Sequence, residues 1–173
     1  MADFSDLSIL PRTLGLKDDA AAEQRERREL LVVRAGARLL GVFADEAGGV
    51  TEWREPTPLP RASPAVLGVV SIRGLLLTVL DPLRLLGEPT AGESAQPAFI
   101  VALRGDEQLA LAVDRALRID EIFADEIEPL TRNSGASILR GVVGRGRDII
   151  AVLAIKELFA AAMQGEERRR QRT

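Results

Sequence analysis

Residues 67–86 read LGVVSIRGLLLTVLDPLRLL, and residues 140–159 read RGVVGRGRDIIAVLAIKELF. When the chain is shifted along itself, the Gly-Val-Val of the first stretch falls on the Gly-Val-Val of the second, and apolar positions further along coincide too. Such self-similarity at a fixed offset indicates an internal duplication. The coinciding positions are Gly68, Val69, Val70, Leu76, Leu77, Val79, Leu80, Leu85 and Leu86 with Gly141, Val142, Val143, Ile149, Ile150, Val152, Leu153, Leu158 and Phe159.

The sequence upstream of each stretch is duplicated as well, at an offset that differs by a few residues. Two copies of one β unit with loops of different length would produce this difference. Residues 87–97 are polar and contain Gly and Pro, as expected of a linker. We therefore predict a first subdomain over residues 30–90 and a second over 91–153. The upstream matches are Gly36, Leu31, Val32, Leu40, Val42, Asp45, Val50 and Glu52 with Gly105, Ile100, Val101, Leu109, Leu111, Asp114, Ile119 and Glu121.

Short apolar runs, separated by Gly, Pro and charged residues, predict strands in both copies. Leu109, Leu111 and Val113 alternate with Ala110 and Ala112, so one face of this strand should carry large side chains and the other small ones. The predicted fold class is mostly β. It consists of two small β-barrels, related by the duplication and packed together with a groove between them.

Helices are predicted at both ends of this β body. Residues 17–29 alternate charge signs, and Glu23 with Arg27 forms an i, i+4 pair, so we expect the extension over residues 1–29 to contain an exposed helix. Asp81 and Pro82 predict a short helical turn that ends at Gly87. A C-terminal helix is expected over residues 155–163, followed by a polar, Arg-rich tail over 164–173.

Composition argues against an enzyme. The 173 residues contain no Cys and no His, which removes thiol nucleophiles, thiolate metal sites and the usual general base. Asp45, Asp81 and Asp114 lie at strand ends in both copies, without a spacing typical of metal ligands or paired catalytic acids, so turn or capping roles are expected. We predict no catalytic residue, no metal and no cofactor. No stretch is apolar enough to cross a bilayer, and the cytoplasm is the default location.

One exposed arginine stands out at a predicted hairpin turn. Arg73 and Gly74 separate two apolar strands, and Gly74 can adopt the positive φ that a tight turn requires. Val70 and Ile72 should share the buried face, while Arg73 projects from the polar face. A surface Arg is usually a solubilising charge, but Arg is also enriched at interface hot spots. In the second copy, residues 144–148 form the corresponding turn, and the strand after them argues against a phosphate-binding loop.

The Arg-rich tail suggests nucleic-acid binding as an alternative function, because clustered arginines neutralise phosphates. The rest of the chain gives this alternative little support. Aromatic residues make up 3% of the chain, there is no Tyr, Trp53 is the single Trp, and the net charge is −3. Nucleic acid is therefore not an expected partner of the β body.

The chain resembles the coupling-protein (CheW-like) family of bacterial chemosensory systems. The similarity covers residues 30–159, and the Gly-x-x-x-x-Arg-Gly element is its most specific part. Three departures from the family pattern are Ser71, where Asn is common, the additional Gly48 and Gly49, and the N-terminal extension over residues 1–29, which lies outside the motif. The matching positions are Leu59, Pro60, Val66, Gly68, Val69, Val70, Ser71, Ile72, Arg73, Gly74, Val79, Leu80 and Asp81, then Val113, Asp114, Ile119, Pro129, Leu139, Gly141, Val142 and residues 149–153.

This resemblance implies a CheW-like domain over residues 30–163, built from two SH3-like five-stranded barrels. It implies a non-catalytic adaptor that couples the cytoplasmic tips of chemoreceptors to a CheA-type histidine kinase, within membrane-associated receptor arrays and without inserting into the membrane. Arg73 would lie at a partner-binding region, and the groove between the barrels would receive the receptor. Gly68, Gly74 and Gly141 would be turn glycines.

Overall fold

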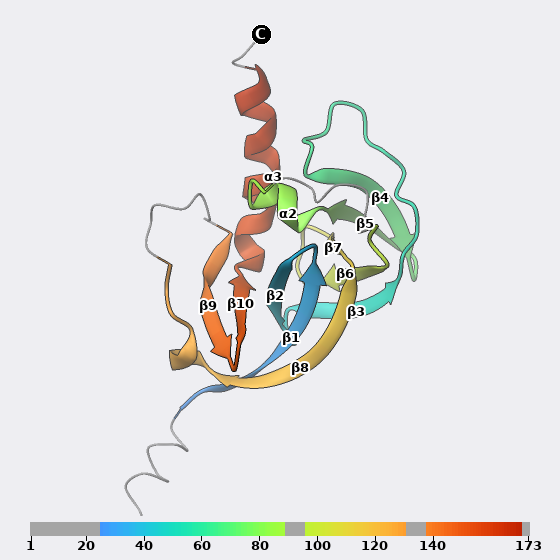
Figure 1. Ribbon diagram of the computed structural model, residues 1–173. Helices are drawn as coiled ribbons and strands as arrows, with labels where there is room; N and C mark the ends of the chain where they lie inside the picture. The colour runs from blue at the N-terminus through green and yellow to red at the C-terminus, as the bar shows by residue number, and fades with distance from the viewer. Residues whose placement is uncertain (1–24, 89–95, 131–137, 171–173) are drawn as a thin grey trace, which may run out of the picture.

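The computed structural model describes residues 25–88, 96–130 and 138–170, with backbone alone for 165–170. Ten strands, two α-helices and one 3-10 turn make up this part of the chain (Figure 1). Within it, no helix is both long and apolar enough to span a membrane. The strands are β1 (Arg27–Ala35), β2 (Arg38–Phe43), β3 (Ala47–Glu52), β4 (Val66–Ile72), β5 (Leu75–Leu80), β6 (Phe99–Leu103), β7 (Leu109–Val113), β8 (Arg115–Phe123), β9 (Leu139–Arg145) and β10 (Asp148–Leu153); the helices are α2 (Pro82–Leu85) and α3 (Ile155–Arg170), and η1 is Ala124–Glu126.

The strands form two five-stranded sheets with corresponding strand orders. The first sheet has the order β8-β1-β2-β10-β9, and the second has the order β3-β6-β7-β5-β4. Replacing each strand of one sheet by its repeat partner gives the other sheet. The parallel pairs also agree in register, because Leu40 lies beside Ala151 in the first sheet and Leu109 lies beside Thr78 in the second. The duplication seen in the sequence therefore corresponds to two equivalent sheets.

The two sheets are interleaved and do not divide at residue 90. The first sheet takes β1 and β2 from the first repeat and β8, β9 and β10 from the second, while the second sheet takes β3 to β5 from the first repeat and β6 and β7 from the second. The subdomain limits expected at 30–90 and 91–153 are thus wrong as sheet boundaries. The reason is that each sheet contains a parallel pair of strands from different repeats, β2 with β10 and β5 with β7. Parallel strands cannot be connected by a short turn, so a sheet that contains such a pair need not consist of consecutive strands.

Three apolar clusters fill the fold. One cluster is formed by residues of the first sheet around Phe43, and one by residues of the second sheet around Ile100. The largest cluster lies between the sheets and includes Leu158 of α3. Strand β7 separates two of them, as its alternation predicted. Its large residues Leu109, Leu111 and Val113 belong to the cluster between the sheets, and its small residues Ala110 and Ala112 belong to the cluster of the second sheet.

The N-terminal end of the body is a strand where a helix was expected. Residues 1–24 lie outside the described residues, but Arg27, Arg28 and Glu29 belong to β1 and pair with β8. The Arg27 guanidinium bonds to the Glu121 carboxylate across the two strands, at 2.9 Å, in place of the expected partner one helical turn away. Sheet pairing therefore overrides the weak local preference for a helix.

The two described helices follow β5 and β10, at equivalent points of the two repeats. The Asp81 carboxylate accepts hydrogen bonds from the backbone N–H groups of Leu83 and Arg84, and Gly87 follows α2 with a φ of 72°. This confirms the predicted capped turn. Helix α3 continues to Arg170, beyond the expected end at residue 163, and projects away from the sheets (Figure 1). Most of the Arg-rich tail is thus helical in its backbone.

Candidate functional site

Arg73 lies in the two-residue turn between β4 and β5. Its φ is 50° and that of Gly74 is 81°, while Ile72 and Leu75 are directly paired on either side. Two successive positive φ angles are the pattern of a type I′ turn, which suits the twist of a hairpin. Positive φ is uncommon for a residue other than Gly. The turn therefore holds Arg73 exposed at the tip of the hairpin, beyond the buried Val70 and Ile72.

A pocket of about 350 Å³ opens beside this arginine. Its walls come from the start of β3, the β4–β5 turn and the β6–β7 loop, and they are mainly apolar. Val50 is 40% exposed and Leu75 is 56% exposed, which is unusual for large apolar side chains in the same small region. The lining residues are Gly48, Gly49, Val50, Thr51, Ile72, Arg73, Leu75, Leu77, Ala102, Leu103, Arg104, Gly105 and Gln108. We call this the Arg73 pocket.

Charge in the Arg73 pocket is positive. Arg104 donates from Nε to the backbone carbonyl of Ala47 at 3.0 Å, and so stays at the pocket wall. Among the described residues, neither Arg73 nor Arg104 is in an ion pair. An apolar hollow bordered by two arginines suits a partner that presents an apolar side chain next to a carboxylate.

The equivalent end of the first sheet has a different electrostatic character. Here Arg118 pairs with Asp120 at 2.9 Å and with Asp148 at 3.3 Å, and Arg145 pairs with Glu126 at 3.0 Å. The hydrogen bond from Arg145 lowers the pKa of the Glu126 carboxyl, and the hydrogen bond to Asp120 raises the pKa of Arg118. The duplication therefore keeps the same fold at both ends, while Arg118 and Arg145 of the first sheet are in ion pairs and the two arginines of the Arg73 pocket, as far as the described residues show, are in none.

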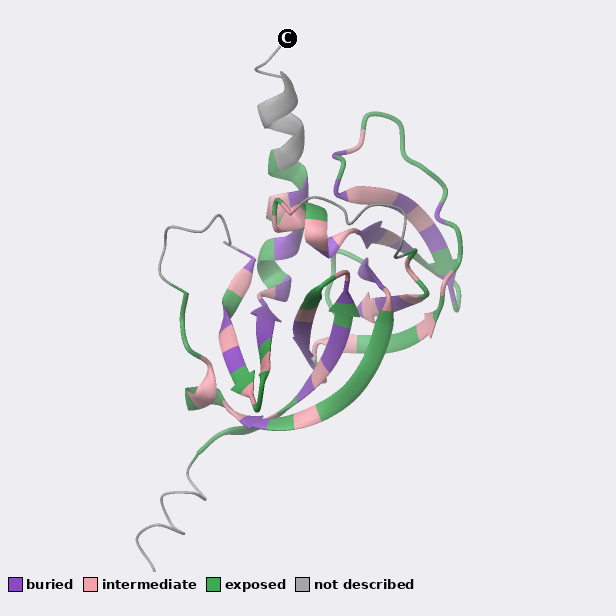
Figure 2. Cartoon of the chain, viewed as in Figure 1, coloured by how far each residue is buried: buried purple, intermediate pink, exposed green. Residues whose placement is uncertain are grey.

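The exposed surface of the first sheet also carries apolar side chains. Strand β8 is exposed over most of its length (Figure 2). Ile119 on this strand is 61% exposed, and Ile149 at the start of β10 is 69% exposed. These positions match Val50 and Leu76 of the first repeat, which are also exposed. Both sheets thus present apolar side chains at equivalent surface positions.

Two of the three glycines expected in turns lie inside strands. Gly68 is in β4 and Gly141 is in β9, whereas Gly74 is in the turn itself. A Cβ on Gly68 would lie 2.3 Å from the Thr57 carbonyl oxygen, and a Cβ on Gly141 would lie 2.3 Å from that of Glu128. The turn assignment for Gly68 and Gly141 is therefore wrong. Both glycines instead allow the segment before the hairpin to cross closely over the strand.

The acidic residues at strand ends have structural contacts. The Asp114 carboxylate accepts a hydrogen bond from the Gly36 backbone N–H at 2.6 Å, and Asp45 forms an ion pair with Arg28 at 2.9 Å. The cap at Asp81 and the bond of Asp114 to the β1–β2 turn match the capping and turn roles expected from the sequence, whereas the contact of Asp45 is an ion pair between side chains. In residues 25–88, 96–130 and 138–164, no three acidic side chains gather into a group that could hold a metal ion.

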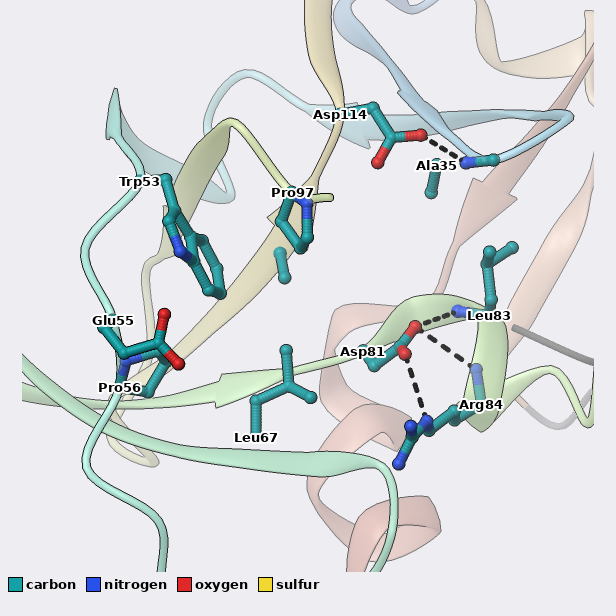
Figure 3. Close-up of a pocket in the computed structure, with 12 residues that line it drawn as sticks. Ala35, Trp53, Glu55, Pro56, Leu67, Asp81, Leu83, Arg84, Pro97 and Asp114 are labelled. Atoms are coloured by element: carbon teal, nitrogen blue, oxygen red, sulfur yellow. Dashed lines mark hydrogen bonds and ion pairs between the residues drawn. The ribbon is translucent and has the colours of Figure 1, made fainter. Parts of the chain in front are cut away.

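Apolar core fills most of the space between the sheets, and a pocket of about 290 Å³ remains at one end of their junction (Figure 3). The first sheet contributes Ala35 at the end of β1 and Gly36 in the β1–β2 turn to its wall, and the second sheet with its flanking loops and α2 contribute the rest. Trp53 and Asp114 face this pocket, which we call the junction pocket. The sequence predicted a groove between the barrels but not its lining, because Trp53 and Asp114 are far apart in the chain and belong to different repeats.

The two five-stranded sheets, which have equivalent topology, define a protein of two SH3-like subdomains. The sequence profile of the CheW-like domain family matches residues 29–163, and the chain belongs to this family of chemotaxis coupling and scaffold proteins. Over 148 residues it is 30% identical to protein FrzA of Myxococcus xanthus, a match that spans 83% of this chain and 92% of FrzA.

Two further comparisons agree with this assignment. The chain is 27% identical to the chemotaxis protein CheW of Rhizobium meliloti, over 76% of this chain and 87% of that protein. Its fold is similar to the crystal structure of the scaffolding protein TtCheW from Thermoanaerobacter tengcongensis, with a TM-score of 0.69 and 20% identity, covering 78% of this chain and 88% of that one.

Proposed function

We propose that this chain is a non-catalytic adaptor, which couples the cytoplasmic tips of chemoreceptors to a CheA-type histidine kinase in a bacterial chemosensory array. The Arg73 pocket is the observation that supports this function best. It combines exposed apolar side chains with arginines, and the chain's membership of the CheW-like family makes a protein the expected ligand. The adaptor works in the cytoplasm and reaches the membrane through the receptors.

Arg73 is the proposed anchor for one of these partners. Arginine is enriched at binding hot spots, where a few residues in a well-packed centre contribute most of the binding free energy. The type I′ turn fixes the backbone of Arg73 at the rim of an apolar hollow, so less conformational freedom is lost when a partner binds. A carboxylate on the partner would pair with the guanidinium while an apolar neighbour fills the pocket.

The substitution Arg73→Glu is expected to weaken binding to the kinase or to the receptor fragment by about 1 to 3 kcal/mol, or roughly 5- to 150-fold. The reversed charge would repel the partner's carboxylate, and the exposed turn position should leave folding intact. Co-sedimentation and titration with each purified partner measure the affinity. The matched control is Arg147→Glu, which reverses the charge in the equivalent turn between β9 and β10.

Three results would contradict this proposal. They are no binding of the unsubstituted chain to either partner at tens of micromolar, equal effects of the two charge reversals, and loss of cooperative unfolding in Arg73→Glu. Retardation of RNA that falls steeply with salt would instead support the nucleic-acid alternative drawn from the Arg-rich tail.

A further inference from the structure

The junction pocket brings together residues from both sheets and both repeats. Gly36 lies in the β1–β2 turn, Trp53 and Glu55 follow β3, Asp81 caps α2, and Asp114 follows β7. The 2.6 Å hydrogen bond from the Gly36 N–H to Asp114 Oδ2 joins the two sheets at the pocket wall. The pocket therefore exists only when both sheets are formed.

The pocket wall is partly apolar, with one aromatic residue, Trp53, and three acidic residues, Glu55, Asp81 and Asp114 (Figure 3). The half-exposed indole of Trp53 stands beside Pro97, and the exposed Glu55 carboxylate lies next to it. Asp114 uses one oxygen to accept the Gly36 hydrogen bond and has its other oxygen available on the pocket side.

Asp81 and Arg84 neutralise each other within this pocket. Asp81 accepts hydrogen bonds from the N-terminus of α2, and its Oδ2 lies 3.3 Å from Arg84 Nε. The Arg84 guanidinium also donates to the Pro64 carbonyl at 2.8 Å, so it is directed away from Glu55 and Asp114. Glu55, next to the Trp53 ring, and Asp114, across the pocket beyond Pro97, thus remain without a positive partner among the described residues (Figure 3).

We propose that the junction pocket binds an arginine side chain of a partner protein. A guanidinium stacks on an aromatic face and forms directional hydrogen bonds to carboxylates, so a single group satisfies both features of the pocket. A volume of about 290 Å³ lies just below the usual range of about 300 to 1,000 Å³ for small-molecule pockets, and therefore favours a single inserted side chain. An anionic group would be repelled by Glu55 and Asp114.

This site is separate from the Arg73 pocket, and the two have opposite charge. The inference rests on the proposed function in one respect only, since it takes the arginine from a protein partner. An adaptor with one cationic and one anionic pocket can distinguish an acidic partner surface from a basic one. If the two partners exchanged places, like charges would face each other in both pockets, and binding would be weaker.

Trp53 provides the test, because it is the single Trp of the chain and forms the pocket wall. The full-length protein is titrated with the capped tripeptide acetyl-Gly-Arg-Gly-amide while Trp53 fluorescence is recorded. The neutral probe is the same peptide with citrulline, which keeps the shape of arginine and removes its charge. We expect saturation with a dissociation constant in the millimolar range for the arginine peptide, and no saturation for the citrulline peptide.

Substitutions in the pocket wall make the test specific. Glu55→Gln and Asp114→Asn are each expected to lower the affinity for the arginine peptide at least threefold. The control is Glu52→Gln, which changes an exposed carboxylate on β3 outside the pocket and should leave the affinity unchanged. Glu55 is exposed, so its substitution should not affect folding. Equal responses to the arginine and citrulline peptides, or equal effects of Glu55→Gln and Glu52→Gln, would overturn the proposal.

The chain's own tail is a competing source of arginine. If removal of residues 165–173 shifted the Trp53 emission, an arginine of the tail would occupy the pocket, and the proposal that a partner's arginine binds there would be refuted. Co-sedimentation with the kinase and receptor separates this inference from the proposed function. If both partners still bind but the arginine peptide does not, the junction pocket proposal fails and the adaptor role stands.

Discussion

Cleavage of the chain between β5 and β6 is expected to leave one folded particle made of two fragments that cannot fold separately. The first sheet needs β1 and β2 from one fragment and β8, β9 and β10 from the other, and the second sheet is divided in the same manner. Each fragment alone would lack the parallel partner of its β2 or β7 strand, and with it the apolar cluster between the sheets. Neither fragment can then bury enough apolar surface to fold.

A protease site inserted at residues 89–95 allows this to be measured. After cleavage, size-exclusion chromatography should still give a single 1:1 complex with the circular dichroism of the intact protein. Fragments purified in denaturant and refolded separately should show no cooperative unfolding, and mixing them should restore it. The uncleaved protein carrying the same insertion is the control. Cooperative unfolding of either fragment alone would refute the interdependence of the two repeats.

Local sequence patterns predicted the strands and the duplication, but not the pairing of the strands. The alternation of Leu109 to Val113 is visible within five residues, and β7 does separate two clusters by side-chain size. The contact between Leu40 and Ala151 is different in kind, because it joins strands from different repeats. Nothing in the periodicity of either strand distinguishes this pairing from one within a single repeat.

The N-terminal end of β1 illustrates competition between local and distant contacts. Glu23 and Arg27 favour a helix by only a few tenths of a kcal/mol. In the fold, residues 27–29 gain a row of backbone hydrogen bonds with β8, and Arg27 finds Glu121. The partner strand lies nearly a hundred residues further along, so the local sequence could not reveal it.

The candidate sites were predictable to different degrees. Arg73 could be singled out because a turn between two apolar strands exposes its residues, and Gly74 suits the positive φ that the turn requires. Its pocket could not be predicted, because Val50 comes from β3 and Arg104 from the β6–β7 loop. The junction pocket depends in addition on the interleaving of the sheets, which brings Gly36 to Asp114. Residue types in the sequence indicated which charges a site could carry, but the topology of the sheets determines which of these residues lie together in a pocket.

The substitution Gly141→Ala is expected to destabilise the protein by about 3 kcal/mol. The added Cβ would lie 2.3 Å from the Glu128 carbonyl oxygen and 2.8 Å from Ile127 Cγ2, so the segment that crosses β9 must move. That movement would stretch the paired hydrogen bonds between Glu128 and Val142, each 2.9 Å long. Overpacking against the backbone is costly because no side chain can rotate out of the way.

Gly144→Ala is the matched control, because it makes the same change on the same strand where nothing lies within 4 Å of the new Cβ. We expect it to be neutral or to stabilise the fold by up to about 1 kcal/mol, since Ala loses less conformational freedom than Gly. Urea unfolding of both variants, followed by circular dichroism, gives the two free energies of unfolding. A difference between them of less than about 1 kcal/mol would mean that close backbone crossing does not explain the glycine at position 141, and the same reasoning would then fail for Gly68.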